Sequence, residues 1–230
     1  MHFFVLFLLC NVFISIYLEP MDKIKIFFGA HKILKIFMWA FLILLGLFIV
    51  LVIYRVFYSF NLDKTNAQVE KIHNTKLSID DVMGVNLPPD PGIEADKTVQ
   101  GIDANQNGIR DDVELAIFKE YPNSAKTRAV LLQYALALQM EVIQPIENTT
   151  TVTEVVREQS RAFSCVGGVV SKEDSQKSYD QLQFLIKYIK DLVFNTKERK
   201  DARNSFLENV RSYSDLNNAV CDIDYSKLAN

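Results

Sequence analysis

The sequence predicts an all-α protein, in which one or two N-terminal transmembrane helices precede a small bundle of about five helices. Three observations indicate this architecture. The uncharged run from Ile36 to Tyr54 is long enough to cross a bilayer as a helix. Beyond Asp112, apolar residues recur at the three- and four-residue spacing of amphipathic helices. An oxygen-rich loop at residues 103–114 lies directly before the first of these helices.

Four segments follow from this pattern. Residues 1–20 are an apolar N-terminal segment, 21–58 a basic leader and transmembrane signal-anchor helix, 59–100 a proline-containing tether, and 101–230 the loop and helical bundle. The first segment lacks the positive residues that begin a signal peptide. It is either a first, short membrane helix that forms a hairpin with the second, or a stretch upstream of a natural start at Met21. Both alternatives export the same C-terminal domain.

The charges that flank the span are unequal. The lysines that precede it are Lys23, Lys25, Lys32 and Lys35. Only Arg55 and Lys64 follow it closely. Because positive residues stay on the cytoplasmic side, the N-terminal side is predicted to be cytoplasmic and the chain beyond about Tyr58 extracytoplasmic. We therefore expect an anchor in the bacterial inner membrane, as a single pass or a hairpin, with a periplasmic C-terminal domain.

Cysteine usage agrees with this placement. Cys165 and Cys221 both lie in the part predicted to be outside, where an isolated pair is most simply a disulfide. A bridge across a loop of that length stabilises a fold by about 4 kcal/mol in the chain-entropy model. Two buried free thiols would be the alternative if the topology were reversed. Cys10 lies in apolar sequence and is expected to be inert.

The loop from Asp103 to Glu114 has the spacing of a calcium site. Ca²⁺ takes six to eight oxygens at about 2.3–2.6 Å, so side-chain oxygens must recur at every second residue while the backbone curls around the ion. Gly108 stands where the chain must turn at positive φ. Ile109 would contribute its carbonyl, and Glu114 both carboxylate oxygens. The predicted ligands are Asp103, Asn105, Asn107, Ile109, Asp111 and Glu114.

The alternative is a bare turn that starts a helix, because the same residue types dominate turns and N-caps. A turn needs no glutamate at the twelfth position, so the pattern favours a metal. Magnesium is disfavoured because it demands stricter octahedral geometry and keeps its waters. Neutral Asn105 and Asn107 in place of aspartates predict a weak affinity, with Kd about 10⁻⁴ to 10⁻³ M.

These residues resemble EF-hand-like, thrombospondin type 3-like calcium repeats of bacterial proteins, written D-x-[DN]-x-[DN]-G-[LI]-x-D-x-x-E. Prolines at 88, 89 and 91 exclude an entering helix, and the sequence has no second copy of the loop. Arg110 stands where paired EF-hands place an apolar residue against a partner loop. The resemblance covers a dozen residues and implies calcium alone. The stretch from Leu87 to Tyr121 also resembles membrane-anchored bacterial proteins of uncharacterised function, which implies no activity.

The first two bundle helices follow the loop directly. One begins at Asp111 or Asp112 and ends at residues 121–123, where proline stops it. Ser124 can cap the second, which runs to about Ile143 and is apolar on nearly all sides. We predict that this second helix is the centre of the bundle.

The other three helices are amphipathic. Thr151 and Glu154 match a capping box for the third, which ends near residues 167–168. The fourth has an apolar stripe from Tyr179 to Val193, and a shorter fifth is marked by Phe206, Val210 and Tyr213. The disulfide would join the end of the third helix to the tail after the fifth.

No catalytic residue is predicted. The histidines are His2, His31 and His73, all before the helical domain, and neither a phosphate-binding loop nor HExxH occurs. Glu154 and Glu158 lie one helical turn apart and are expected to be surface residues. The mixed charges of residues 197–203 are expected to form a solvated helix face, and the net charge of −3 speaks against nucleic acid as a partner.

The sequence thus predicts a membrane-anchored extracytoplasmic helical module in which one calcium ion has a structural role. The ion would fix the proline-rich tether against the first bundle helix, and the module would bind an envelope protein or glycan. A calcium-dependent hydrolase acting on envelope glycan or peptide is the alternative, and it requires a cleft lined by paired acids at the edge of the loop. A calcium sensor is disfavoured because the lone loop lacks a second hand.

Overall fold

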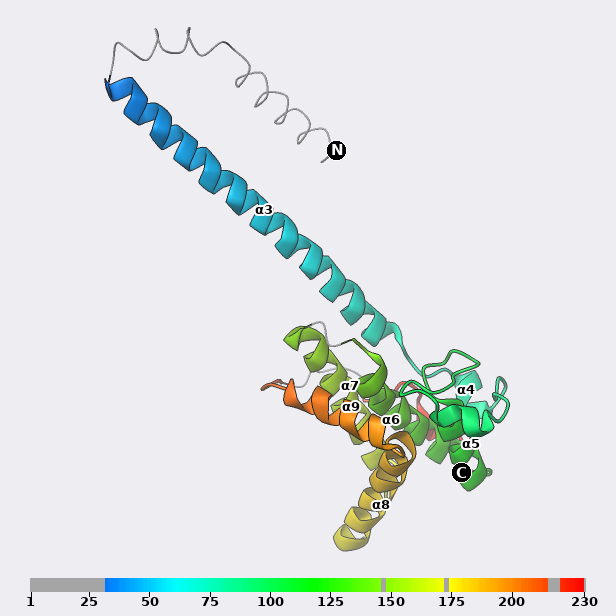
Figure 1. Cartoon of the computed structure of the whole chain (residues 1–230). Helices are drawn as coiled ribbons and strands as arrows, with labels where there is room; N and C mark the ends of the chain where they lie inside the picture. Colours follow the sequence, from blue (N-terminus) through cyan, green and yellow to red (C-terminus); the bar gives the residue numbers. More distant parts are fainter. Residues whose placement is uncertain (1–31, 146–147, 172–173, 215–219, 230) are drawn as a thin grey trace. The chain divides into compact units, whose positions relative to one another are not determined.

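The computed structural model describes residues 32–145, 148–171, 174–214 and 220–229. Every regular element in these ranges is a helix and none is a strand, which confirms the predicted all-α class (Figure 1). The predicted N-terminal segment 1–20, the start of the basic leader and Cys10 lie outside the described residues. The chain divides into two compact units, residues 1–61 and 62–230, which are described separately below.

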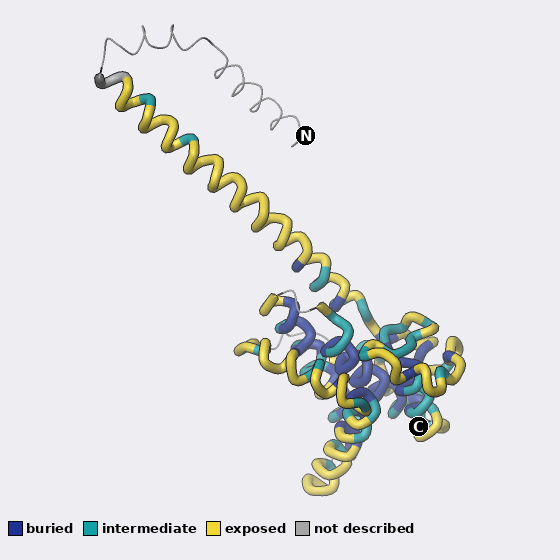
Figure 2. The backbone as a smooth tube through the Cα atoms, viewed as in Figure 1, coloured by how far each residue is buried: buried dark blue, intermediate teal, exposed yellow. Residues whose placement is uncertain are grey.

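The described part of the first unit is apolar helix. It belongs to α3, Lys32–Asn74, and the side chains of residues 35–61 are almost all exposed (Figure 2). Arg55 is the only charged residue between Ile36 and Asn61. The segment is long and apolar enough to cross a membrane, which agrees with the predicted span.

The second unit begins inside α3, and this corrects the predicted tether at residues 59–100. Residues 62–74 continue the helix, and Ile72 is fully buried in the core of the bundle. Nε2 of His73 lies 2.9 Å from Oε2 of Glu154 on a later helix. These contacts join residues that are far apart in sequence, so the polar composition of the stretch gave no sign of them.

The remainder of the predicted tether also folds onto the bundle. It contains a short helix, α4, Ile79–Met83. Oγ of Ser78 accepts from the Asp81 N–H at 3.2 Å, and Oδ2 of Asp81 accepts from the Ser78 N–H at 2.8 Å, which completes a capping box. The 3₁₀ helix η1, Gly92–Asp96, follows the prolines. Leu77 and Val82 are buried, so this stretch contributes to the core.

The helix α6, Ala125–Ile143, is the centre of the bundle, as predicted. Oγ of Ser124 accepts from the Thr127 N–H at 3.2 Å and caps its first turn. Every residue from Arg128 to Glu141 is buried. The elements that contact α6 are α4, α5 (Asp111–Glu120), α7 (Thr149–Gly167), α8 (Ser175–Val193), α9 (Lys197–Glu208) and the 3₁₀ helix η2 (Tyr225–Lys227) (Figure 1).

The start of α7 differs from the predicted capping box of Thr151 and Glu154. Oδ1 of Asn148 accepts from the N–H groups of Thr150 and Thr151 at 2.9 and 3.2 Å, so Asn148 is the N-cap. Thr151 is the third helical residue, and its Oγ1 accepts from the Asn148 N–H at 3.4 Å. Asparagine and threonine are both favoured caps, so the sequence pattern alone did not separate them.

Two glutamates of α7 that were expected on the surface are buried. Glu154 and Glu158 are 6% and 7% exposed. Nζ of Lys76 donates to Oε2 of Glu158 at 2.9 Å, and Nε of Arg161 donates to the same oxygen at 2.9 Å. The segment after α3 covers this face of α7, so the two carboxylates are paired with cations there.

The predicted apolar stripes of α8 and α9 are buried only in part. In α8, Leu185, Ile189 and Val193 are in the core, whereas Tyr179 is 58% exposed because the first half of the helix extends past the other helices of the bundle (Figure 2). In α9, Phe206 is buried as predicted, but the helix ends at Glu208. Val210 and Tyr213 therefore follow the fifth helix instead of belonging to it.

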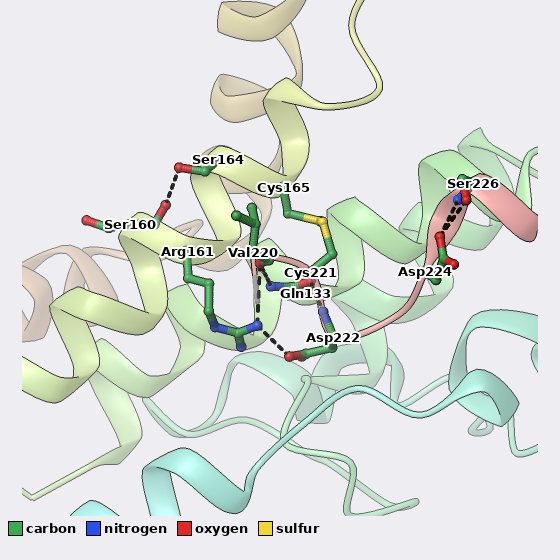
Figure 3. The surroundings of a disulfide bond; sticks show 10 residues. All are labelled: Gln133, Ser160, Arg161, Ser164, Cys165, Val220, Cys221, Asp222, Asp224 and Ser226. Carbon is green, nitrogen blue, oxygen red and sulfur yellow. Dashed lines mark hydrogen bonds and ion pairs between the residues drawn. A yellow bond between two sulfur atoms is a disulfide. The ribbon is translucent and has the colours of Figure 1, made fainter. Parts of the chain in front are cut away.

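The predicted disulfide joins Cys165, near the end of α7, to Cys221 in the tail, with the two Cα atoms 5.2 Å apart (Figure 3). Gln133 on α6 holds the same segment. Its Nε2 donates to the carbonyl of the residue before Cys221 at 3.0 Å, and its Oε1 accepts from the Asp222 N–H at 2.9 Å. Nη1 of Arg161 lies 2.7 Å from Oδ1 of Asp222. The tail is therefore attached to α6 and α7 by covalent and polar contacts.

Glu141, at the end of α6, makes the stability of the bundle depend on pH. Burial raises the pKa of Glu141 to about 7, although Arg203, whose Nε donates to Oε2 at 3.2 Å, opposes the rise. Lys190 and the phenol of Tyr134 also face this carboxyl. Between the unfolded pKa of 4.5 and the folded pKa of about 7, the folded chain binds the additional proton. Stability from this group therefore falls as pH rises through that window.

We expect the free energy of unfolding to be larger at about pH 5 than at about pH 7.5, with a contribution from Glu141 on the order of 2 kcal/mol. Denaturant unfolding of the full chain and of Glu141→Gln, at matched pH values, measures this contribution. The glutamine variant keeps the shape of the side chain and cannot ionise, so its stability should vary less with pH. Parallel pH profiles for the two proteins would contradict the prediction.

Candidate metal centre

The loop of residues 103–114 lies between η1 and α5. Because α5 begins at Asp111, the last four loop positions form its first turn, as predicted for an exiting helix. Gly108 has a φ of +86°, and a Cβ there would lie 2.7 Å from Cδ1 of Leu136 on α6. Backbone conformation and space therefore both require glycine at the sixth position of the loop.

The side chains at the first, third and fifth positions bind the backbone of the loop. Asp103 accepts from the N–H groups of Asn107 and Gly108 at 3.2 and 2.9 Å. Oδ1 of Asn105 accepts from the Asn107 N–H at 3.3 Å, and Oδ1 of Asn107 accepts from the Ile109 N–H at 2.8 Å. These bonds close the chain into a tight curve.

Glu114, at the twelfth position of the loop, lies beside this curve of the chain. The residue is fully buried, and its Oε2 accepts from Nδ2 of Asn105 and of Asn107 at 3.0 and 3.2 Å. The structure therefore assembles the third, fifth and twelfth positions around one point. Oε1 of Glu114 is buried and has no hydrogen-bond partner among the described residues.

Asp111 has a similar environment. It is 1% exposed, its Oδ1 accepts from the Ala104 N–H at 3.0 Å, and its Oδ2 is buried without a hydrogen-bond partner in the described part of the chain. Burial raises the pKa of Asp111, partly opposed by the Ala104 N–H. Burial likewise raises the pKa of Glu114 to about 7, with further contributions from the negative charges of Asp81 and Asp111. Hydrogen bonds from Asn105 and Asn107 oppose the rise at Glu114, but one oxygen of each carboxyl is left without a partner in the described part of the chain.

The three acids predicted as ligands have no cationic side chain as a partner among the described residues. Within the described ranges, no Lys, Arg or His nitrogen is recorded within 4.0 Å of the carboxylates of Asp103, Asp111 or Glu114. In the same ranges, no three His, Cys, Asp or Glu side chains are placed to hold a metal by themselves. A metal would therefore also need neutral oxygens, which the loop offers from Asn105 and Asn107. Carboxylate, amide and carbonyl oxygens are the donor set that calcium accepts.

Arg110, at the eighth position, belongs to the bundle and has no access to a partner loop. Its guanidinium is completely buried. Nη1 donates to the carbonyl of Val193 and Nη2 to that of Leu192, each at 3.0 Å, at the C-terminus of α8. Nε and Nη2 also donate to the carboxylate of Asp112 at 2.6 and 2.7 Å. A cation here satisfies the last carbonyls of α8 and fixes the loop against that helix.

Arg199 fixes the chain that leads into the loop, and it is the one buried residue of the expected solvated face at residues 197–203, whose other charged residues are exposed or half-buried. Its side chain is completely buried. Nε donates to the carbonyl of Val99 at 3.1 Å and Nη2 to that of Thr98 at 3.0 Å, and Asp96 accepts a charged hydrogen bond from Nη1. This bond from Arg199 holds the pKa of the Asp96 carboxyl below its ordinary value. Two buried arginines therefore hold the loop and its approach against α8 and α9.

Two neighbours of the loop were not predicted from the sequence. The carbonyl of Asn86 accepts from Nδ2 of Asn105 at 3.0 Å, and the charge of Asp81 acts on Glu114. Both residues lie in the stretch that was predicted to be a tether. The capping pattern of Ser78 and Asp81 was the one local sign that this stretch is ordered.

No protein-family model matches the chain, and no curated protein or solved structure is similar to it. The fold and the site therefore define the class: a disulfide-bonded helical bundle with an acidic loop that buries two carboxyls, in a chain with one helix apolar enough to span a membrane. Functional proposals for this chain rest on its own residues and their geometry.

Proposed function

We propose that residues 103–114 bind one Ca²⁺ with a structural role, in a membrane-anchored helical module. The observation that carries the proposal is the pair of buried, unpartnered carboxylate oxygens, Oδ2 of Asp111 and Oε1 of Glu114. Buried polar atoms without partners are costly and rare, and buried carboxylates are normally paired with a cation. A bound divalent cation supplies the missing positive charge.

The ligands proposed are those of the sequence pattern: the side chains of Asp103, Asn105, Asn107, Asp111 and Glu114 and the carbonyl of Ile109. The same loop contacts the segment after α3 through Asn86 and the central helix through Gly108. Calcium would therefore stabilise the junction between the stretch that follows α3 and the start of α5. With two neutral amides among the ligands, we expect a Kd of about 10⁻⁴ to 10⁻³ M, in the range of extracellular modules.

We further propose that α3 anchors the chain in the bacterial inner membrane and that the second unit is periplasmic. The unequal lysines around the span and the disulfide between Cys165 and Cys221 support this placement. The role that fits best is an envelope binding or scaffold module whose partner is an envelope protein or glycan. The hydrolase alternative stays a prediction from the sequence without a specific observation in its favour.

Calcium titration of the full chain in non-ionic detergent, by calorimetry and thermal unfolding, tests the proposal. We expect one saturable site and a rise in Tm, because calcium at about one hundred times Kd adds roughly 2.7 kcal/mol to stability. Glu114→Gln should abolish both effects at calcium concentrations that saturate the unsubstituted chain.

Glu120→Gln is the matched control, because it removes the same charge from an exposed position on the same helix. In the absence of calcium, the Tm of Glu114→Gln should equal or exceed that of the unsubstituted chain, since a buried glutamine need not ionise. This comparison separates loss of the metal from loss of the fold. Equal weakening by both variants, or no saturable heat at about 10 mM calcium, ten times the weakest expected Kd, would refute the proposal.

A further inference from the structure

A basic cleft of about 470 Å³ lies between α8 and α9. We call it the α8–α9 cleft. Its charged lining consists of one carboxylate, Asp191, and four cations, Lys187, Lys190, Lys200 and Arg203. Lys187 forms an ion pair with Asp191 four residues later, which leaves three cations. This concentration of positive charge is unexpected in a chain with a net charge of −3.

Arg203 lies at the wall of the cleft, where two contacts fix its side chain. The carbon at the centre of its guanidinium lies 4.6 Å from the centroid of the Phe194 ring, and its Nε donates to Glu141 at 3.2 Å. In the described part of the chain, its two terminal nitrogens have no recorded hydrogen-bond partner. The stacked and bonded side chain therefore presents the free edge of its guanidinium in a fixed orientation, which suits an oxyanion.

Lys190 and Lys200 add charge beside this edge. Lys190 is half-buried, and burial together with repulsion by Arg203 lowers its pKa, while Glu141 opposes that change. Lys200 is exposed. Across the described residues, neither ammonium group has a carboxylate recorded within 4.0 Å or a recorded hydrogen-bond partner. An anion in the cleft would relieve the repulsion between Lys190 and Arg203.

We propose that the α8–α9 cleft binds a phosphate monoester through Lys190, Lys200 and the free edge of Arg203. Among the described residues, Lys190 and Lys200 have no carboxylate within 4.0 Å, whereas the charge of Arg203 is paired with Glu141 and its free edge adds donors. Two uncompensated charges and these donors match a group that carries close to two negative charges and three acceptor oxygens, whereas a carboxylate brings one charge. The cleft is larger than a phosphate group and lies within the size range of small-molecule sites, so it also has room for the rest of the ligand. A soluble phosphate ester and the headgroup of phosphatidic acid share this chemistry.

Calorimetric titration of the full chain in non-ionic detergent with phenyl phosphate at about pH 8, without calcium, tests the proposal, since a phosphate monoester is dianionic there. We expect saturable binding, and binding of benzoate that is at least about tenfold weaker, because it carries a single charge. The double variant Lys190→Gln, Lys200→Gln should weaken phenyl phosphate binding by about tenfold or more. Arg203→Lys, which keeps the charge but removes the planar fork, should weaken it by about threefold or more.

The matched control is Lys119→Gln, Lys177→Gln, which removes the same charge from exposed positions outside the cleft and should change the affinity by less than about twofold. Equal weakening by both double variants, equal binding of benzoate, or no saturable heat with phenyl phosphate at about 10 mM would overturn the proposal, since a Kd above that corresponds to less than about 3 kcal/mol. Dihexanoyl phosphatidic acid and glycerol phosphate distinguish the sources of the ligand. Tighter binding of the former supports a lipid headgroup, and equal binding supports a soluble ester.

Discussion

Replacing Cys165 and Cys221 together by alanine is expected to lower the free energy of unfolding by about 4 kcal/mol, the chain-entropy value for a bridge that spans 56 residues. For a unit of this size, the loss corresponds to a decrease in Tm of roughly 10 °C. Thermal and denaturant unfolding of the full chain in detergent, oxidised and reduced, measure it. Reduction of the unsubstituted chain should have a similar effect.

The double alanine variant supplies its own control, because a reductant should leave its Tm unchanged. Polar contacts should keep the tail in place after the bridge is removed, since Gln133 binds both neighbours of Cys221 and Arg161 pairs with Asp222. We therefore expect a native-like far-UV spectrum at low temperature. A loss below about 1 kcal/mol would show that the bridge hardly constrains the unfolded chain, contrary to the prediction.

Arg199→Met is expected to destabilise the bundle by about 3 kcal/mol, because it removes a buried guanidinium that donates several hydrogen bonds. Methionine fills similar space but cannot donate to the carbonyls of Thr98 and Val99 or to that of Ala95, which would then be buried without a partner. Denaturant unfolding of the full chain at about pH 7 measures the loss. The pKa of Asp96 should also return upward towards its ordinary value, because Arg199 is the main cause of its depression.

Lys197→Met, two residues earlier in the same helix and exposed, is the control and should change stability by less than about 0.5 kcal/mol. Arg199→Lys separates the contribution of the hydrogen-bond geometry from that of the positive charge. Lysine keeps the positive charge but cannot reach several carbonyls with one planar group, so most of the loss should remain. If the lysine variant were as stable as the unsubstituted chain, charge alone would explain the role of Arg199 and the hydrogen-bond argument would fail.

The spacing of apolar residues predicted the helices, because each helix is determined by its own apolar face or by its own capping residue. The runs from Ala129 to Leu132 and from Tyr134 to Leu138, apolar on nearly all sides, identified the central helix, and Ser124 its start. The pairing of Cys165 with Cys221 followed from counting cysteines on one side of a predicted span. Gly108 was expected at positive φ, and the structure places it there. In each case, the residues that determine the feature lie within a few positions of one another or, for the disulfide, can pair in only one way.

Residues whose role depends on distant partners could not be predicted in this way. Arg199 lies among exposed charged residues, and its buried position depends on carbonyls about one hundred residues earlier in the sequence. Glu158 is buried because Lys76 and the segment around it cover α7, and that segment has the composition of a linker. Asn105, Asn107 and Glu114 of the predicted set are in contact, but the pattern of the loop gave no sign of its neighbours Asn86 and Asp81.

The burial of α6 from Arg128 to Glu141 has a consequence for how the bundle unfolds. A helix without a polar face cannot remain in water by itself, and each surrounding helix covers a different part of it. Release of any one neighbour would expose apolar surface that the others cannot cover, so partly unfolded forms are penalised. The bundle should therefore lose its structure in one cooperative transition, and fragments that retain α6 without its neighbours should aggregate.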